Sequence, residues 1–199
     1  MLHRPYGPTA WLIEEIDEPL AWAAGLEQLG LDGVHEIVPA KETVLVITER
    51  SAHDEVGQLL VSVSPIAQRE HQRQVDIDVV YDGDDLDTVA EQTGISVNEL
   101  IERHSAASYQ VAFCGFSPGF AYLGGLDEAL RIPRRDRPRT KVPAGSVAIA
   151  ADYSCVYPSM SPGGWHLLGR TTAKVWDTDR SRPALLVPGT VVRFNPVRP

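Results

Sequence analysis

The sequence predicts an α+β protein in two parts, and three observations predict it. The first 81 residues alternate strand and helix signals in the order βαββαβ. A helical segment rich in acidic residues follows over residues 84–107. From Tyr109 onward, short β-branched and aromatic runs are separated by Gly and Pro turns, which is typical of a barrel or a sandwich. We therefore expect a first domain over residues 1–81, and a short helical segment plus a β-barrel over residues 82–199.

The first domain is expected to be ferredoxin-like, because the order βαββαβ defines that split motif. Strands are expected where residues are β-branched or alternate between apolar and polar: Ala10–Ile16, Val34–Val38, Thr43–Thr48 and Val75–Tyr81. One helix is expected from Leu20 to Leu29, since Pro19 precedes it and Gly30 follows it. A second is expected from Ala52 to Ser62, with Ser51 as its cap.

The second part begins with two short helices divided by Gly94, the second opening on a capping-box pattern at Ser96–Glu99. Its many acidic side chains and single arginine would repel phosphate, which excludes a helix-turn-helix that reads DNA. The strands expected after these helices are Tyr109–Cys114, Ser146–Ala150, Ser154–Tyr157, Trp165–Leu168, Ala173–Trp176, Ala184–Val187 and Val191–Phe194.

Charge and composition narrow the function classes. The net charge is −9, but residues 106–199 carry 12 Lys and Arg against 6 Asp and Glu. An acidic first half argues against nucleic-acid binding, and the absence of long apolar runs argues against a membrane protein. Two isolated cysteines and no evident signal peptide favour a cytoplasmic protein. The sequence shows no metal site, no organic cofactor site and no phosphate-binding loop.

The stretch from Phe113 to Thr171 holds half of the aromatic residues and half of the 16 glycines. Rigid turns that present aromatic side chains beside cations predict a binding surface. The cations are Arg131, Arg134, Arg135, Arg137, Arg139 and Lys141, which would suit a small anion or an acidic partner. Two plainer interpretations stay open: a solvated basic loop, and aromatic rings that form the barrel core.

Four blocks in this region carry a family resemblance: GFSPGFAYLGGL (115–126), PRRDRPRTKVPAGSVAIA (133–150), YPSMSPGGWHLLGRT (157–171) and LLVPGTVVRF (185–194). Together they resemble the 5-oxoprolinase B-subunit family, also called allophanate hydrolase subunit 1 or the Kip-inhibitor family. The resemblance implies a ferredoxin-like first domain and a cyclophilin-like barrel. The chain departs from the family pattern at Asp84-Asp85-Leu86, where Gly-Pro-Asp-Leu is usual, and at Lys41, where arginine is usual.

The resemblance implies a hydrolase component that is inactive alone. The assembled enzyme would use ATP as co-substrate and open the lactam of 5-oxoproline to give glutamate. The implied partners are a related barrel protein of the C-subunit family (allophanate hydrolase subunit 2, or Kip antagonist) and a third 5-oxoprolinase component. The resemblance leaves two alternatives: a regulatory protein that inhibits a sensor histidine kinase, and a component of an allophanate- or urea-processing amidohydrolase or carboxyltransferase. Prolyl isomerisation ranks last, because barrel type alone does not carry function.

Lactam opening requires cations or N–H donors where negative charge develops, and an acid for the departing nitrogen. The catalytic candidates are His104, Tyr109 and Arg139, although a helix C-cap is an alternative role for His104. The substrate-binding candidates are Phe116, Pro118, Gly119, Phe120, Tyr122, Arg134, Pro143, Ser146, Tyr157, Gly163, Gly164, Trp165 and Arg170. Among these, the arginines would bind a carboxylate or phosphoryl group and the glycine turns would offer backbone N–H groups.

Overall fold

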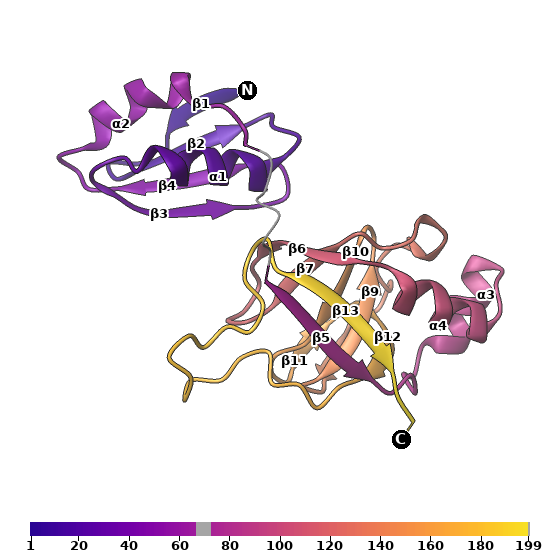
Figure 1. The fold of residues 1–199 in the computed structure, drawn as a ribbon. Coiled ribbons are helices and arrows are strands. Elements are labelled where there is room, and N and C mark those ends of the chain that lie inside the picture. Colours follow the sequence, from indigo (N-terminus) through magenta and orange to yellow (C-terminus); the bar gives the residue numbers. More distant parts are fainter. Residues whose placement is uncertain (67–72, 199) are drawn as a thin grey trace. The chain divides into compact units, whose positions relative to one another are not determined.

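A computed structural model describes residues 1–66 and 73–198 of the chain, as two compact units (Figure 1). The first unit is Met1–Gln72 and the second is Arg73–Pro199. Each unit has its own hydrophobic core, so each is described by itself.

The first unit is a four-stranded antiparallel sheet with two helices, in the strand order β1-β2-β4-β3. The strands are β1 (Leu2–Pro5), β2 (Ala10–Glu14), β3 (Val34–Pro39) and β4 (Val44–Thr48). Helix α1 (Pro19–Leu29) ends at Gly30, whose left-handed conformation agrees with the predicted stop. Helix α2 (His53–Leu59) continues into a 3₁₀ turn over Leu60–Ser62. The core joins Ile13 of β2, Val44 and Val46 of β4 and Leu26 of α1.

Two expectations for this unit are wrong. The strand predicted at Val75–Tyr81 is β5 (Gln74–Val79), and it pairs in parallel with β13 (Val191–Pro196) of the second unit. The edge beside β2 is filled instead by β1, so the expected order βαββαβ fails in its last strand. Ser51 does not cap α2, because its hydroxyl donates to the Glu49 carboxylate.

The second unit is a seven-stranded, nearly closed barrel-like sheet in the order β12-β9-β10-β7-β6-β13-β5. The other strands are β6 (Tyr109–Cys114), β7 (Ala121–Gly124), β9 (Ser146–Ala150), β10 (Tyr153–Val156) and β12 (His166–Arg170). The two edges meet at Val80 and Arg170, which exchange backbone hydrogen bonds of 2.9 Å in both directions. A separate two-stranded ribbon joins β8 (Arg139–Val142) to β11 (Ser161–Gly163).

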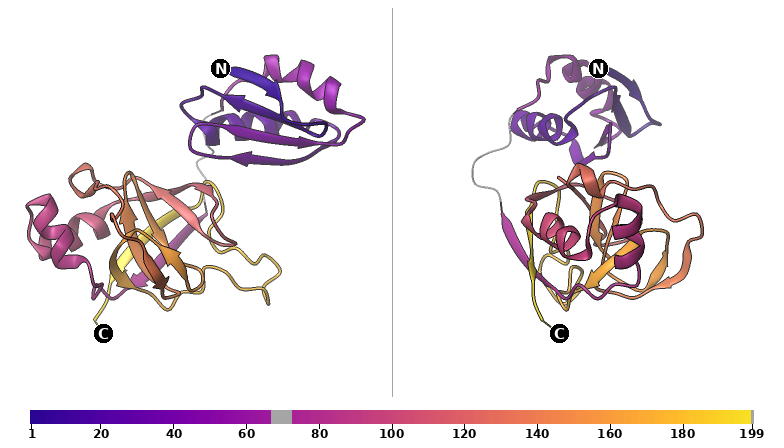
Figure 2. Two further views of the ribbon diagram at one scale, coloured as in Figure 1. Left: turned by 180° about the vertical axis from the view of Figure 1, so that it is seen from behind. Right: turned by 90° about the vertical axis from the view of Figure 1, so that its right-hand side faces the viewer.

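Helices α3 (Leu86–Thr93) and α4 (Val97–Ala106) lie together on one side of the barrel, and all views agree on this (Figures 1 and 2). The N–H of Glu99 donates to Ser96 Oγ at 3.2 Å, which confirms the predicted cap of α4. Leu86, Val89 and Leu100 from these helices pack in the same core as the barrel residues Val147 and Leu168.

Strand β9 is buried on both faces, which explains its uninterrupted small and apolar sequence. Val147 and Ile149 belong to the core that the helices share, whereas Ala148 and Ala150 belong to a second cluster with Phe120, Tyr157 and Trp165. Because neighbouring strand residues point to opposite faces, the second cluster covers the opposite face of this strand. The predicted aromatic-rich stretch therefore builds a layer of its own.

The long segment after β12 also differs from the prediction. Ala173–Trp176 and Ala184–Val187 do not form strands, and the Trp176–Ala184 bridge joins them at a single point. Strands β7, β8 and β11 were not predicted, because the Gly and Pro residues around them break the period-two pattern that indicates a strand.

Candidate functional site

Three arginines lie along one short segment, Gly163–Trp165, which connects the ribbon to β12. Arg139 is the β8 partner of Gly163 in the ribbon. The backbone N–H of Arg135 donates to the Gly164 carbonyl at 2.8 Å. The guanidinium carbon of Arg134 lies 5.9 Å from the centre of the Trp165 ring. The structure thus brings together six residues of the predicted basic and glycine-rich blocks, and we call this arrangement the arginine wall.

An aromatic cluster lies next to the arginine wall, with Phe120 at its centre. Ring centres lie 5.3 Å from Phe120 at Phe116, 5.2 Å at Tyr157 and 5.7 Å at Trp165, all with edge-to-face geometry. Tyr122 also contacts Phe120 and Trp165. Phe120, Tyr157 and Trp165 are buried, so for these rings the core interpretation is supported. Phe116 differs, because 64% of its surface is exposed.

Phe116 has an unusual backbone conformation, with φ at 68° although it is not glycine. Its turn is fixed by hydrogen bonds from the Gly115 N–H to the Phe120 carbonyl and from the Phe120 N–H back to the Ser117 carbonyl. Gly119 has φ at 80°, and a Cβ there would lie 2.6 Å from Trp176 Cβ. A strained turn that holds an aromatic ring in solvent is typical of a functional position.

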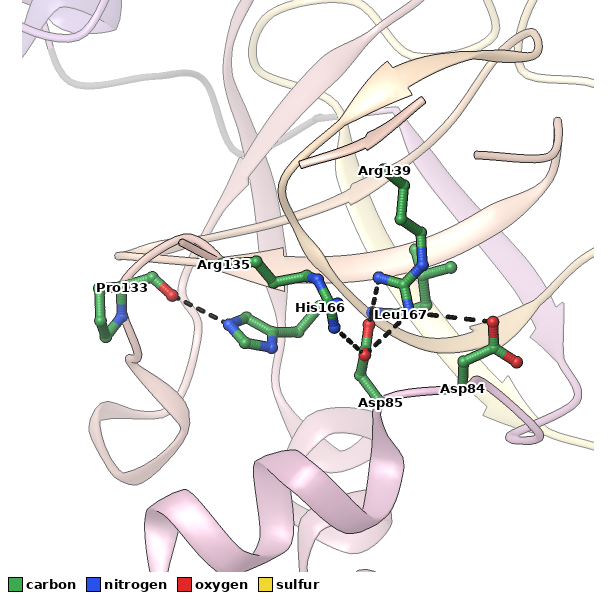
Figure 3. A network of polar contacts seen from close by, with 7 residues as sticks. All are labelled: Asp84, Asp85, Pro133, Arg135, Arg139, His166 and Leu167. Atoms are coloured by element: carbon green, nitrogen blue, oxygen red, sulfur yellow. Dashed lines mark hydrogen bonds and ion pairs between the residues drawn. The ribbon is translucent and has the colours of Figure 1, made fainter. Parts of the chain in front are cut away.

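Asp85 neutralises two of the three wall arginines (Figure 3). Asp85 is 2% exposed, and its carboxylate accepts hydrogen bonds from both terminal nitrogens of Arg139, from Arg135 and from the Leu167 N–H. Burial disfavours its charged form, but the hydrogen bonds from Arg139 and Leu167 and the charges of Arg139 and Arg135 outweigh burial, so its pKa lies below the ordinary value. The catalytic candidate Arg139 is therefore one half of a buried ion pair.

The remaining cations divide into paired and free groups. The Arg170 guanidinium lies 2.8 Å from Asp82, so this binding candidate is also paired. In the part of the chain that the structure describes, no acidic side chain pairs with Arg134 or with Lys141, and both are exposed. Of these described cations, Arg134 is thus the one that combines a free guanidinium with a place on the arginine wall.

His104 and Tyr109 lie on the other side of the sheet, in the core with α3 and α4. His104 is fully buried, with Nδ1 2.7 Å from the Tyr81 hydroxyl and Nε2 3.0 Å from Ser154 Oγ. The Ser154 hydroxyl lies 3.3 Å from the Ala148 carbonyl, which can only accept. The hydrogen bonds therefore run from Tyr81 to His104, then to Ser154 and the carbonyl, with the proton of neutral His104 on Nε2.

This geometry gives His104 and Tyr109 structural roles in place of the expected proton transfer. Burial lowers the pKa of His104 to about 3, so its ring stays neutral near pH 7. Burial raises the pKa of the Tyr109 hydroxyl, which donates to the His104 carbonyl at 2.9 Å. Although Ser154, His104 and Tyr81 have the residue types of a relay, Ser154 donates its proton to a carbonyl and is not activated for attack.

Tyr157 and Ser146, two further binding candidates, are joined through their backbones. The Tyr157 N–H donates to the Ser146 carbonyl, and the Tyr157 carbonyl accepts from the Gly145 N–H. Ser146 in turn is the β9 partner of Arg170. Pro118 and Pro143 are both exposed. Tyr157 therefore connects the aromatic cluster to the Pro143–Ser146 turn.

Sequence reasoning missed Asp85, Tyr81 and Ser154 as members of these networks. Only Asp85 had a usable signal: it lies in an acidic turn directly before a helix, beside a departure from the family pattern. Among the described residues, no group of three or more His, Cys, Asp or Glu side chains is arranged to hold a metal ion. None of the helices in the described ranges is long and apolar enough to cross a membrane.

Comparison with known proteins defines the class. The family model described as "Carboxyltransferase domain, subdomain C and D" matches residues 2–186, so the chain is a carboxyltransferase-domain protein. The 5-oxoprolinase B subunit of Escherichia coli O157:H7 is 38% identical over 204 residues, which cover 96% of this chain and 93% of that protein. The chain belongs to the 5-oxoprolinase B-subunit family, as its four sequence blocks predicted.

Solved structures agree with the fold. The crystal structure of TTHA0988 matches with a TM-score of 0.82 and 32% identity, covering 100% of this chain but 41% of that one. This chain therefore spans about two fifths of TTHA0988. The urea amidolyase of K. lactis matches with a TM-score of 0.73 over 98% of this chain and 15% of its own; at 21% identity, this likeness shows a shared fold alone.

Proposed function

We propose that this chain is one component of an ATP-dependent 5-oxoprolinase and binds the 5-oxoproline carboxylate at Arg134. Relatives named as the B subunit of 5-oxoprolinase support the enzyme. The observation that carries the site is the free Arg134 guanidinium above Trp165, next to the aromatic cluster. A guanidinium binds a carboxylate through two parallel hydrogen bonds, and the exposed Phe116 ring offers an apolar face for the five-membered ring.

The chain's contribution is binding and orientation of the substrate. The two side chains expected to move protons, His104 and Tyr109, are both 0% exposed. We propose that the proton-transfer groups and the ATP site come from a related barrel protein of the C-subunit family and a third component. ATP would phosphorylate the lactam oxygen and leave as ADP. Water would then add to the ring carbon, and the C–N bond would break as the ring nitrogen takes a proton, which leaves an acyl phosphate. A second water would hydrolyse this acyl phosphate to glutamate and phosphate. This division of labour explains why the chain would be inactive alone.

A reconstitution assay tests this proposal. The chain alone, the chain with the C-subunit protein, and all three components are each supplied with 5-oxoproline and ATP, and glutamate is measured. We expect glutamate only from the mixture that contains all three components. Full activity from the lone chain would contradict its role as one component of a complex. If the complete mixture makes no glutamate, the result would favour the alternative that the chain is a regulatory protein that inhibits a sensor histidine kinase.

A second candidate function is carboxyl transfer, which the matched carboxyltransferase family model favours. A carboxylated intermediate is also an anion that Arg134 can bind. The same complete mixture, supplied with urea and bicarbonate in place of 5-oxoproline, distinguishes the two. Bicarbonate-dependent ATP hydrolysis without glutamate would support carboxyl transfer.

A further inference from the structure

The arginine wall aligns three arginines with the Gly163–Trp165 segment, Arg139 and Arg135 through their backbones and Arg134 through its guanidinium. Of these three, Arg134 has no described acidic partner. A wall with three free arginines would attract phosphate chains, since each guanidinium offers a bidentate donor pair. Asp85 prevents this, because its buried carboxylate takes both terminal nitrogens of Arg139, at 2.8 and 2.9 Å, and one of Arg135. Figure 3 shows both guanidinium groups directed at this one carboxylate.

Backbone contacts hold Asp85 in place independently of the arginines. Its carboxylate accepts the Leu167 N–H at 2.7 Å, and its own N–H donates to the Leu167 carbonyl at 3.1 Å. The preceding turn is equally close to β12: a Cβ on Gly83 would lie 2.3 Å from the Leu167 carbonyl oxygen. Asp85 is therefore fixed to Leu167 at the start of β12, and Leu167 lies two residues after Trp165. Arg135 and Arg139 are in turn fixed to Asp85.

We infer that Asp85 is a positioning residue that sets the charge of the ligand which the arginine wall accepts, so that a small monocarboxylate binds and a polyphosphate does not. This inference rests on the proposed function, since 5-oxoproline is such a monocarboxylate. It assigns the triphosphate of ATP to a surface other than the Gly163–Trp165 segment. Asp85 acts through Arg135 and Arg139 and does not itself contact the substrate.

The variants that test this are Asp85→Asn and a matched control, Asp82→Asn. Both remove one negative charge, and Asp82 releases Arg170 from a more exposed ion pair away from the wall. Titration calorimetry of the full chain with inorganic pyrophosphate measures binding without requiring catalysis. We expect Asp85→Asn to bind pyrophosphate at least about tenfold more tightly than the wild type, because two guanidinium groups become available for charged hydrogen bonds. Asp82→Asn should match the wild type.

Equal pyrophosphate affinity of Asp85→Asn and Asp82→Asn would overturn the inference, as would wild-type binding as tight as that of Asp85→Asn. A purely structural role for Asp85 would lower stability without any gain in pyrophosphate affinity. If circular dichroism shows that Asp85→Asn is unfolded, the double variant Asp85→Asn/Arg135→Gln is compared with Arg135→Gln in the same way; in it, Arg139 keeps the exposed Asp84, 3.8 Å away, as its acidic partner. The glutamate assay is separate, so failure here leaves the proposed function to its own test.

Discussion

Arg139 donates both of its terminal nitrogens to Asp85, at 2.8 and 2.9 Å, and this pair ties the β8–β11 ribbon to the turn before α3. This pair gives Arg139 a structural role, whereas the sequence suggested that it binds an anionic ligand. An arginine in a basic loop predicts an anion site, but here the anion is a buried side chain of the same chain. Among the described residues of the arginine wall, the arginine without an acidic partner is Arg134, five residues earlier.

The Asp85 pair makes a testable contribution to stability. Asp85→Asn should lower the free energy of unfolding of the second unit by about 3–5 kcal/mol, because Arg135 and Arg139 lose their buried carboxylate partner. Arg139 would keep only the exposed Asp84, at 3.8 Å. Asp82→Asn should cost no more than about 1 kcal/mol, since its pair with Arg170 is more exposed. Urea denaturation of both variants measures the difference. Equal losses of unfolding free energy in the two variants would show that the buried Asp85 pair stabilises the fold no more than the exposed Asp82 pair does.

His104 makes stability depend on pH. Its pKa is about 3 when folded and about 6.5 when unfolded, so between these values the unfolded chain binds more protons. Stability of the second unit should therefore fall as pH drops from about 6.5 towards 3, by at most about 1.4 kcal/mol per pH unit.

Urea denaturation at several pH values measures this slope. His104→Gln should flatten it, whereas Tyr81→Phe should lower stability but keep the slope, because the imidazole stays. An unchanged slope in His104→Gln would contradict the buried neutral histidine.

Two adjacent glycines should respond differently to alanine. At Gly163 a Cβ would lie 2.2 Å from the Tyr157 hydroxyl oxygen, whereas at Gly164 the nearest atoms are 3.7 Å away. Gly163→Ala should cost about 1–3 kcal/mol through overpacking, and Gly164→Ala should stay within about 0.5 kcal/mol of the wild type. Thermal denaturation of the two variants checks this. A tolerated Gly163→Ala would show that Tyr157 is not held against the ribbon.

A substitution at Phe116 should impair substrate binding without lowering stability. Asparagine tolerates the left-handed conformation better than phenylalanine, so Phe116→Asn should keep or raise stability, by up to about 1 kcal/mol. The same change removes the exposed ring and should raise the KM for 5-oxoproline in the reconstituted complex. Phe120→Ala is the contrast: it removes a buried ring and should cost about 3–5 kcal/mol. A strongly destabilised Phe116→Asn would show that the exposed ring supports the fold.

Local patterns predicted many of the elements, because their causes are local. The Pro19 and Gly30 limits of α1, the Ser96 cap of α4 and the bounds of β6 follow from nearby residues. The alternation in VDIDVVY likewise indicated a strand. It could not indicate the partner strand, because pairing with β13 depends on residues more than a hundred positions later.

The candidate site was likewise predictable only where its features depend on nearby residues. The residue types of the arginine wall were visible in sequence, and the structure brings Arg134, Gly164 and Trp165 together as the blocks suggested. Which arginine stays free was not visible, since that depends on a carboxylate about fifty positions earlier. Burial decided the rest: His104 and Tyr109 have suitable chemistry, but tertiary packing places them in the core.

The most direct test of the account is the KM for 5-oxoproline in the complete complex, compared between Arg134→Gln and Arg137→Gln. Both variants remove one positive charge, and in the described part of the chain neither arginine has an acidic partner. Loss of a bidentate carboxylate contact should raise the KM of Arg134→Gln by about tenfold or more, while Arg137→Gln keeps the wild-type value. Equal KM values for the two variants would contradict the assignment of Arg134 as the substrate's carboxylate ligand.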